Sequence, residues 1–370
     1  MNILITNSTD IYGGGEFYVL ELARSLRDRR HHVTVCCKPE NLLRRKCDQA
    51  GIPVIPLDFP STGRLAHFIF RLRNIIRERD IEIVHTNSNY DRTVGAFAAY
   101  FSGVKHVTNV HSFHSIQHNV THWVRNRFAT DHFLVDGLCV KDLLVRDDKI
   151  PSSKISVVHL GVDSAMMKKD PAARERVRRE FGVAPDNVII GNVGRLVPMK
   201  GQEFLLRGFA GVAQEFPKAV LFIVGDGELM GKLKALAEEL RIGPRTIFAG
   251  FRDDLTPVYS AFDIYVHSSI EGGGETFPFA VLQALAEELP VVVTKVGDVS
   301  EMVDEGVNGF VVPDSDPAII GASIARLLGD RSLQKQMAEG SYRRFLRLFT
   351  REKMVDEIER VYNRVWGARA

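Results

Sequence analysis

Short β-rich runs alternate with amphipathic helical stretches along this chain, and the alternation stops once and then starts again. Such a pattern predicts parallel sheets covered by helices on both faces. The break is a charge-rich segment at 166–187, which we interpret as a connection containing one exposed helix. The sequence therefore predicts two doubly wound α/β domains with a hinge near residues 163–186. At 370 residues the chain fits two domains of about 150–200 residues each.

The predicted strands are short apolar runs, many of them rich in Val and Ile. They cover residues 2–7, 32–37, 53–57, 81–87, 106–111, 132–137, 155–163, 188–196, 219–227, 246–251, 263–269, 290–295 and 309–314. Helices are predicted between them, for example at 16–28 and 65–79, and a last helix at about 351–366 should pack back on the first domain. We therefore expect domains at 1–165 and 166–349, with a crossover helix within 350–370. Ligands of open α/β sheets bind at the carboxyl ends of the strands, so the cleft between the domains is the expected site.

The composition fits a soluble globular protein, with 45% hydrophobic and 25% charged residues. The longest apolar runs fall far short of the ~20 residues that a membrane span needs. The first residues, "MNILITNS", lack a basic region and a cleavage pattern, so we interpret them as a strand rather than a signal peptide. The four cysteines form no C-x-x-C pair, which is typical of a reducing compartment, and the cytoplasm is expected.

Positive charge is concentrated in the first half of the chain. Residues 1–160 carry 21 Lys/Arg against 16 Asp/Glu, a net charge of +5, and eleven of the twelve histidines. An anionic partner is therefore expected there. The stretch 63–80 combines apolar residues with five arginines. Two interpretations stay open for it: a core helix with a solvated basic face, or contact with an anionic membrane surface.

Three segments follow predicted strands and carry residues suited to binding a phosphorylated ligand. Gly13, Gly14 and Gly15 join a strand to a helix, which fits either a tight turn or close approach to an anion. Arg195 and Lys200 follow another strand, and two cations at its carboxyl end suit a diphosphate, although surface cations are often merely solvated.

The third segment is "EGGGETFPFAVLQALAEELPVVVT", residues 271–294, which predicts a loop, a helix and a buried strand. Pro278 fits the first turn of a helix at 278–288, whose free N–H groups would point into the loop. Glu275 lies in that loop and Gln283 lies on the helix, eight residues further on.

Other patterns favour structural roles. The glycines at 225–231 mimic a dinucleotide fingerprint, but no acidic residue ends the next strand, so tight packing explains them better. Histidines recur between 111 and 122 without the other ligands of a zinc site. His111 differs from the rest because it ends a strand and should lie at the cleft edge. Residues 314–316 read D-S-D, which we interpret as a turn.

These stretches, taken in order, resemble glycosyltransferase family four, also described as glycosyl transferases group one. Its members are retaining, nucleotide-sugar-dependent enzymes of the GT-B fold, with two Rossmann-like domains that face each other across a cleft. The resemblance rests on "YGGGEFYVLELARSLRDRRHHVTV", "IEIVHTNS", "VTNVHS", "ISVVHLGVD", "VGRLVPMKG", "VGDGEL", "IFAGF", "VHSSIEGGGETFPFAVLQALAEELPVVVT" and "VSEMVDEGVNGFVVPDSD".

The resemblance implies roles for individual residues. Arg195 and Lys200 would bind the diphosphate, Glu275 the hydroxyls of the transferred sugar, and His111 the sugar near the reacting carbon. Gln283 stands where the family usually has a second glutamate that holds the ribose. Further donor-binding residues implied by the family pattern are Gly14, Gly15, Phe251, Thr276, Phe277, Pro278 and Phe279.

The resemblance also implies an activity. The chain is expected to move a sugar, with retention, from a UDP or GDP sugar to a hydroxyl of a glycan, lipid-linked or lipopolysaccharide-type acceptor in cell-envelope polysaccharide biosynthesis. No cofactor, metal or nucleic acid is expected, and the enzyme should be cytoplasmic, with peripheral contact to the inner membrane face as a hypothesis. The alternatives are an epimerase or hydrolase of the same fold, or a non-catalytic nucleotide-sugar-binding protein.

Overall fold

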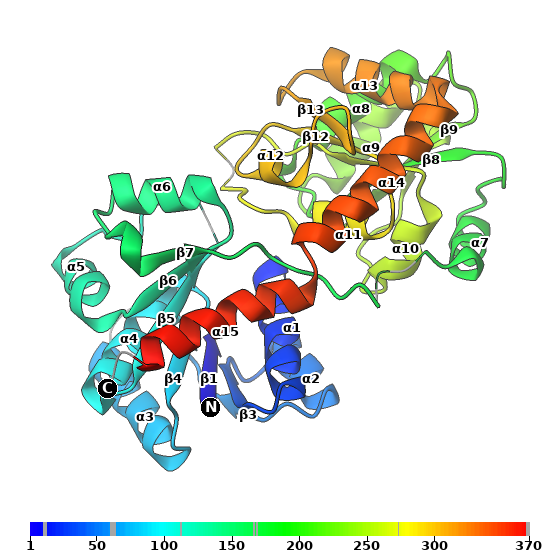
Figure 1. The fold of residues 1–370 in the computed structure, drawn as a ribbon. Helices are drawn as coiled ribbons and strands as arrows, with labels where there is room; N and C mark the ends of the chain where they lie inside the picture. The colour runs from blue at the N-terminus through cyan, green and yellow to red at the C-terminus, as the bar shows by residue number, and fades with distance from the viewer. Residues whose placement is uncertain are drawn as a thin grey trace. The chain divides into compact units, whose positions relative to one another are not determined.

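A computed structural model describes residues 1–9, 13–59, 64–111, 113–165, 167, 169–272 and 274–367. The chain forms two compact units, one made of Met1–Leu160 with Arg351–Ala370 and the other of Gly161–Thr350 (Figure 1). Each unit is built on one parallel sheet, as the alternating pattern predicts, and each is described by itself. Within the described ranges, no helix combines the length and the apolar character needed to cross a membrane.

The sheet of the first unit has seven strands in the order β3-β2-β1-β4-β5-β6-β7. The strands are β1 (Asn2–Asn7), β2 (His32–Cys37), β3 (Val54–Pro56), β4 (Ile83–Thr86), β5 (Lys105–Val110), β6 (His132–Val135) and β7 (Ile155–Val157). The winding direction reverses between β1 and β4, which makes their carboxyl ends the switch point where ligands bind in such sheets.

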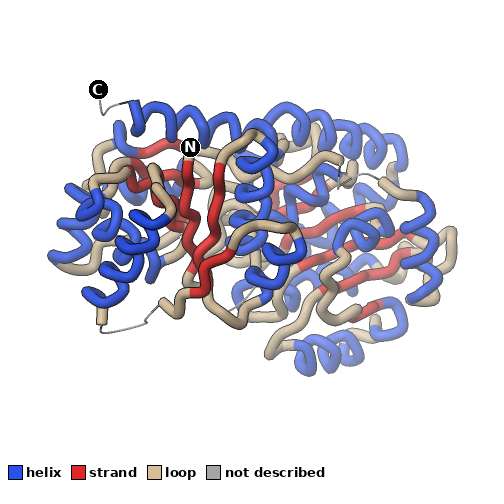
Figure 2. Tube along the Cα trace, turned by 90° about the horizontal axis from the view of Figure 1, so that it is seen from below, coloured by secondary structure: helices blue, strands red, loops and turns tan. Residues whose placement is uncertain are grey.

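Helices cover both faces of this sheet (Figures 1 and 2). They are α1 (Gly14–Asp28), α2 (Leu42–Gln49), α3 (Leu65–Glu78), α4 (Asn89–Ser102), α5 (Val120–Val124), α6 (Leu138–Arg146) and α15 (Arg351–Gly367), with a π-helical turn η1 (Arg125–Ala129) and a 3₁₀ turn η2 (Ser152–Lys154). Successive residues of β4 show the two layers, because neighbouring side chains on a strand point to opposite faces. Val84 packs in the cluster formed with α3 and α4, whereas His85 contacts Tyr362 of α15. The last helix therefore belongs to the first unit, as expected.

The sheet of the second unit has six strands in the order β10-β9-β8-β11-β12-β13. They are β8 (Val188–Val193), β9 (Ala219–Val224), β10 (Thr246–Phe248), β11 (Ile264–His267), β12 (Val291–Thr294) and β13 (Gly309–Val312). The helices are α7 (Pro171–Glu180), α8 (Gln202–Val212), α9 (Met230–Glu239), α10 (Leu255–Ala261), α11 (Phe279–Ala286), α12 (Val299–Met302), α13 (Pro317–Gly329) and α14 (Arg331–Leu348), with 3₁₀ turns η3 (Pro198–Lys200) and η4 (Gly243–Arg245). The switch point here lies between β8 and β11.

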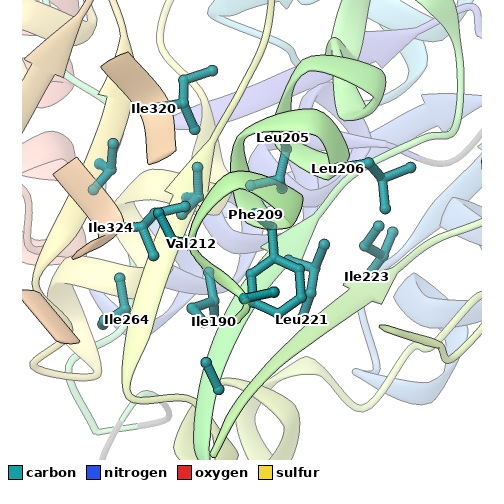
Figure 3. Close-up of a cluster of buried hydrophobic side chains, with 14 of the residues drawn as sticks. Ile190, Leu205, Leu206, Phe209, Val212, Leu221, Ile223, Ile264, Ile320 and Ile324 are labelled. Atoms are coloured by element: carbon teal, nitrogen blue, oxygen red, sulfur yellow. The ribbon is translucent and has the colours of Figure 1, made fainter. Parts of the chain in front are cut away.

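One face of this second sheet is sealed by α8 and α13. Figure 3 shows side chains of α8 converging on the strands, with two isoleucines of α13 beside them. The fully buried members of this cluster include Ile190, Leu205, Leu206, Phe209, Leu221, Ile223, Ile264, Ile320 and Ile324. Apolar residues of α8 recur three and four positions apart, which places them on one face of the helix.

All thirteen predicted strands are present, but the segment 155–163 was predicted too long. Its strand ends at Val157, and Val162 instead pairs with Thr350 within the second unit. Val162 also donates its N–H to the Phe349 carbonyl at 3.1 Å. Residues 166 and 168 of the predicted hinge, and residue 63 at the start of the basic stretch, lie outside the described residues.

The helix predicted within 166–187 is present and six of its ten residues are exposed, but one side of it is buried against the second unit. Helix α7 packs on the second unit, and Arg178 is 5% exposed. Its guanidinium donates to the Asp263 carboxylate at 2.6 Å, and Arg174 donates to the same carboxylate at 2.7 Å. Both arginines also donate to carbonyls near residue 261, so a charge-rich helix is held against the domain by long-range hydrogen bonds.

Two helices begin at different residues from those expected. Helix α1 already starts at Gly14, with Gly13 as its N-cap, so two of the three glycines belong to the first helical turn. Helix α11 starts at Phe279, and Pro278 is its N-cap with an extended backbone rather than its first helical residue.

Two of the three glycines at 225–231, Gly225 and Gly227, are explained by backbone packing, although between loops rather than between helix and strand; Gly231 lies in α9 with nothing within 4 Å of an added methyl group. A methyl group at Gly225 would lie 1.9 Å from the Gly194 carbonyl oxygen, and one at Gly227 would lie 2.4 Å from that of Leu196. Both glycines also have positive φ angles, 136° and 158°. The D-S-D stretch is a turn as predicted, because Ser315 has φ 58° and Asp316 caps α13.

Candidate functional site

The switch point of the second unit brings together the loops after β8 and β11. Arg195 and Lys200 lie in the first loop, and Glu275 lies in the second. Two hydrogen bonds join these loops: the Ile270 N–H donates to the Met199 carbonyl at 3.0 Å, and the Ser268 side chain donates through Oγ to the Lys200 carbonyl at 2.9 Å. These contacts fix the position of the Lys200 backbone.

Gly201 makes this close approach sterically possible. Its φ is 60°, and an added methyl group would lie only 2.1 Å from the Ser268 carbonyl oxygen. The left-handed conformation and the lack of space both favour glycine. Gly201 is also the N-cap of α8. The η3 turn, which ends at Lys200, therefore leads directly into this helix.

Lys200 and Glu275 form an ion pair between Nζ and Oε2. Both side chains are largely buried, with exposed fractions of 18% and 14%. Ser269 Oγ donates to the same carboxylate oxygen at 3.1 Å. Burial alone would raise the pKa of Glu275, but the charge of Lys200 outweighs it and lowers that pKa below its ordinary value, so the carboxylate is ionised at neutral pH.

His267 lies beneath this pair at the end of β11. Its Nε2 is 3.7 Å from Glu275 Oε2, and that nitrogen has no hydrogen-bond partner among the described residues. The side chain is 3% exposed, and burial lowers its pKa to about 4. At neutral pH the imidazole is therefore uncharged, and Glu275 has one cationic neighbour in this cluster, Lys200.

Arg195 is exposed, and its main chain is anchored by Gln202 Nε2, which donates to the Arg195 carbonyl at 3.0 Å. Its guanidinium thus projects from a fixed backbone position at the carboxyl edge of β8. Phe251, which follows β10 at the same edge of the sheet, is 65% exposed. Both side chains are accessible to a ligand.

The residues between Glu275 and α11 contribute in different ways. Thr276 and Phe277 are only 4% and 3% exposed, and the Phe277 ring packs against Phe349 with centroids 5.6 Å apart. Any contact of these two residues with a ligand would therefore come from their backbone. Gln283 is 8% exposed on α11, and Phe279, the first helical residue, is half-buried.

A turn at residue 297 supports the Glu275 backbone. A methyl group at Gly297 would lie 2.4 Å from the Glu275 carbonyl oxygen, and the Asp298 N–H donates to the Thr276 carbonyl at 2.9 Å. The polar loop is thus held from below by a second turn, which keeps the Glu275 side chain beside Lys200.

In the first unit, the switch point lies at the carboxyl ends of β1 and β4. Gly14 is exposed and Gly15 half-buried at the start of α1. Neither Gly14 nor Gly15 has a positive φ, so backbone conformation does not require glycine there. Glu16 holds the helix start, because its carboxylate accepts from the Gly13 N–H at 2.8 Å and from Asn7 Nδ2 at 3.0 Å.

His111 lies directly after β5, as expected, with an 18% exposed side chain. Its Nδ1 is 2.8 Å from the Asp136 carboxylate, which follows β6, and its Nε2 is 2.8 Å from Asn87 Oδ1, which follows β4. The structure thus places the predicted residues in two sets: Arg195, Lys200, Glu275 and Gln283 in the second unit, and Gly14, Gly15 and His111 in the first.

Sequence reasoning missed the partners of these residues, namely Asn87, Asp136, His267 and Ser269. One signal was available for all four: each is a polar residue at, or within two residues of, the carboxyl end of a strand, where the predicted site should lie. The histidines from 114 to 122 do not line one helix, because α5 spans only Val120–Val124. Among the described residues, no group of three His, Cys, Asp or Glu side chains is arranged to hold a metal ion.

Comparison with known proteins decides the family. Residues 12–165 match the family described as Glycosyltransferase Family 4, and residues 173–344 match Glycosyl transferases group 1. The chain belongs to the glycosyltransferases of the GT-B fold. This confirms the resemblance on which the residue roles depend.

Individual relatives are distant. The chain is 26% identical over 315 residues to an Escherichia coli UDP-Gal:alpha-D-GlcNAc-diphosphoundecaprenol alpha-1,3-galactosyltransferase, covering 80% of this chain and 78% of the relative. It is 31% identical over 186 residues to a GDP-mannose-dependent phosphatidylinositol monomannoside mannosyltransferase of Mycolicibacterium smegmatis, covering 49% and 48%. The structure of Anabaena HepE in complex with UDP matches with a TM-score of 0.87 at 23% identity, covering 98% of this glycosyltransferase and all of HepE; at that identity it shows the fold.

Proposed function

We propose that this glycosyltransferase moves a sugar, with retention and without a metal ion, from a UDP or GDP sugar to a hydroxyl of a glycan or lipid-linked acceptor of the cell envelope. The observation that carries the proposal is the Lys200–Glu275 pair at the switch point of the second unit, with Arg195 on the same strand edge. Relatives that use UDP-galactose or GDP-mannose support the choice of donor.

The proposed chemistry breaks the bond between the anomeric carbon and the diphosphate oxygen and forms one to the acceptor oxygen on the same face. The acceptor proton passes to the leaving phosphate, so no protein nucleophile is needed. Arg195 and Lys200 offset the charge that develops on the leaving group. Because Lys200 already neutralises Glu275, a bound diphosphate would share this cation, and Glu275 would turn to the sugar hydroxyls.

The acceptor is proposed to bind the first unit. That unit contains an apolar hollow of about 180 Å³, lined by Phe97, Tyr100, Phe101, Val124, Phe128 and Ala129. The relative that acts on a diphosphoundecaprenol-linked sugar supports a lipid-linked acceptor. We propose that the enzyme works in the cytoplasm in peripheral contact with the inner face of the membrane.

The surface proposed for this membrane contact is the outer side of α3 and α4. Leu72 and Ile76 of α3 are buried, whereas Phe70 is 59% exposed with Arg73 over its ring. Helix α4 packs against α3 and adds exposed Tyr100 and Phe101. Exposed aromatic rings beside arginines suit the interface of an anionic bilayer. Failure of the protein to sediment with anionic vesicles at low salt would refute this contact.

A donor-consumption assay tests the activity. The protein is incubated with UDP-glucose, UDP-galactose or GDP-mannose, with and without an envelope lipid extract, and with EDTA in a parallel series. Consumption that needs the extract and resists EDTA supports the proposal, and NMR of the product anomer reads out retention. Consumption without an acceptor would indicate a hydrolase or epimerase instead. Nucleotide-sugar binding without consumption would indicate a non-catalytic protein.

A further inference from the structure

Three neighbouring strands of the first unit end in polar residues that contact one another. In the sheet order β4-β5-β6, Asn87 follows β4, His111 follows β5 and Asp136 follows β6. The carboxyl ends of adjacent parallel strands lie side by side, so these side chains meet at one edge. Their contacts involve both ring nitrogens of the His111 imidazole.

Asp136 determines the protonation of one nitrogen of the ring. Its two carboxylate oxygens lie 2.9 and 2.8 Å from His111 Nδ1, and the residue is 4% exposed. A carboxylate only accepts hydrogen bonds, so Nδ1 must carry a proton to make this contact. The hydrogen bond made by one ring nitrogen sets the tautomer and therefore the role of the other.

The other nitrogen faces two amides. Nε2 lies 2.8 Å from Asn87 Oδ1 and 3.2 Å from Asn109 Nδ2. The orientation of the Asn87 amide is set by its Nδ2, which donates to the Gly15 carbonyl at 3.1 Å. Asn109 Nδ2 also donates to Asn87 Oδ1 at 3.3 Å. With the amide held in this way, Oδ1 is the acceptor that faces Nε2, so Nε2 donates in this contact. A sugar hydroxyl oxygen could take over that hydrogen bond, because Asn109 Nδ2 would remain as a donor to Asn87 Oδ1.

Tyr18 holds the ring plane. This tyrosine of α1 is 2% exposed, and its ring meets the imidazole edge-on with centroids 4.9 Å apart. His111 is thus held on both nitrogens and along one side, and its partners come from α1 and from the ends of β4, β5 and β6.

We propose that Asp136 and Asn87 are positioning residues for sugar transfer. Asp136 keeps a proton on Nδ1, so that Nε2 is the nitrogen presented to the sugar. Asn87 joins the imidazole to the Gly15 backbone, which couples the glycine-rich helix start to His111. This inference rests on the proposed function, because it assigns His111 to a sugar substrate.

The chain supplies a matched control at the other end of the same strand. Asp131 directly precedes β6, at the opposite end of the strand from Asp136, and accepts from Lys105 Nζ at 3.2 Å and from the His106 N–H at 2.9 Å. Asp136→Asn and Asp131→Asn both replace a hydrogen-bonded carboxylate by a neutral amide of the same shape. If Asp136 had a purely structural role, the two variants would have the same kcat and the same donor KM.

The test combines kinetics with nitrogen NMR. We expect Asp136→Asn to lower kcat by roughly 10- to 100-fold, the loss seen when a metal-bound histidine is deprived of its orienting partner, with the donor KM changed less than about threefold. Asp136→Glu should recover part of the rate, and Asp131→Asn should match wild type. A long-range ¹H–¹⁵N spectrum of the wild type should show a proton on Nδ1 of His111.

Each other outcome overturns the proposal. Wild-type kcat in Asp136→Asn, or equal losses in both Asp→Asn variants, would leave Asp136 a structural residue. A proton on Nε2 alone would show that Asp136 does not set the tautomer. A wild-type protein without transfer activity would refute the proposed function itself, and the spectrum would still decide whether Asp136 controls His111.

Discussion

Lys200 and Glu275 stand 75 residues apart in the sequence and form a largely buried ion pair at the carboxyl edge of the second sheet. Removing one partner of a buried pair leaves an uncompensated charge and typically costs about 3–5 kcal/mol. The pair therefore couples the stability of the second unit to the residues proposed to bind the donor.

A double-mutant cycle should reveal this coupling. Lys200→Met and Glu275→Gln should each lower the free energy of unfolding, and the double variant should lose less than the sum of the two. Urea denaturation followed by circular dichroism measures all four proteins. Additive losses would mean that the two side chains do not interact. All three variants should transfer sugar much more slowly than wild type.

Arg195→Ala should separate activity from stability. The side chain is exposed, so we expect an unchanged midpoint of urea unfolding, together with a loss of about 100-fold in kcat/KM, the order expected for one preorganised charge contact. Arg207→Ala, which removes an exposed arginine from α8 of the same unit, is the control. Equal activity of the two variants would remove Arg195 from the diphosphate site.

Gly201→Ala should displace the lysine loop. The new methyl group would meet the Ser268 carbonyl oxygen, in addition to the cost of φ 60°. Gly306→Ala is the control, since its φ is 76° but nothing lies within 4 Å of the added carbon. Backbone strain should lower the stability of both variants by about 1–2 kcal/mol, whereas only Gly201→Ala should also weaken UDP or GDP binding in a thermal-shift titration. Equal nucleotide affinity in the two would contradict this.

Gln283→Glu tests whether the glutamine is a working residue. A carboxylate makes a stronger, charge-assisted hydrogen bond to a ribose hydroxyl than an amide does. We expect the donor KM to fall by up to about tenfold and kcat to change less than about threefold. A gain in kcat from near zero would instead identify the natural protein as a decayed, non-catalytic binder.

The pH dependence of the second unit should show two opposed contributions. His267 is the one histidine among residues 161–370. Its folded pKa of about 4 lies below the ordinary 6.5, so the unfolded chain binds more protons between these values and stability falls as pH drops from 6.5 to 4. Glu287 is fully buried, one of its oxygens has no partner among the described residues, and burial raises its pKa from 4.5 to about 7. It therefore reduces stability as pH rises from 4.5 to 7.

Each contribution is on the order of 3 kcal/mol, so they largely cancel between pH 4.5 and 6.5. His267→Asn should leave a stability that falls as pH rises through this window, and Glu287→Gln should leave one that rises. Urea unfolding at half-unit pH steps measures both slopes against wild type. Parallel curves for the two variants would refute the assignment.

The elements of the fold were predictable from local pattern, and the contacts of the site were not. Short apolar runs identify β8 and β11 because both faces of each strand are buried, and apolar residues at helical spacing identify α11. This pattern also places Glu275 and Lys200 at strand ends. However, it does not show that the two pair with each other, because that depends on the approach of two loops at Gly201.

The incorrect predictions also arise from long-range contacts that a local sequence pattern does not record. Helix α7 has the composition of a solvated helix, but two of its arginines, Arg174 and Arg178, donate to distant carbonyls and to the Asp263 carboxylate. Phe277 looks like a neighbour of the donor in sequence, yet its ring fills space beside Phe349. Asp136 was visible as a polar residue near the end of the predicted strand 132–137, but its hydrogen bond to His111 depends on strand order, which a linear pattern does not record.

The first unit is assembled from two segments that the second unit separates in the sequence, since α15 completes a domain built mainly from residues 1–160. During synthesis the ribosome makes the whole of 161–350 before it makes the helix whose Tyr362 contacts His85 and whose Glu359 pairs with Arg29. The first unit therefore cannot complete these contacts until Arg351–Gly367 has been synthesised, so its last helix docks after the whole of the second unit has been made.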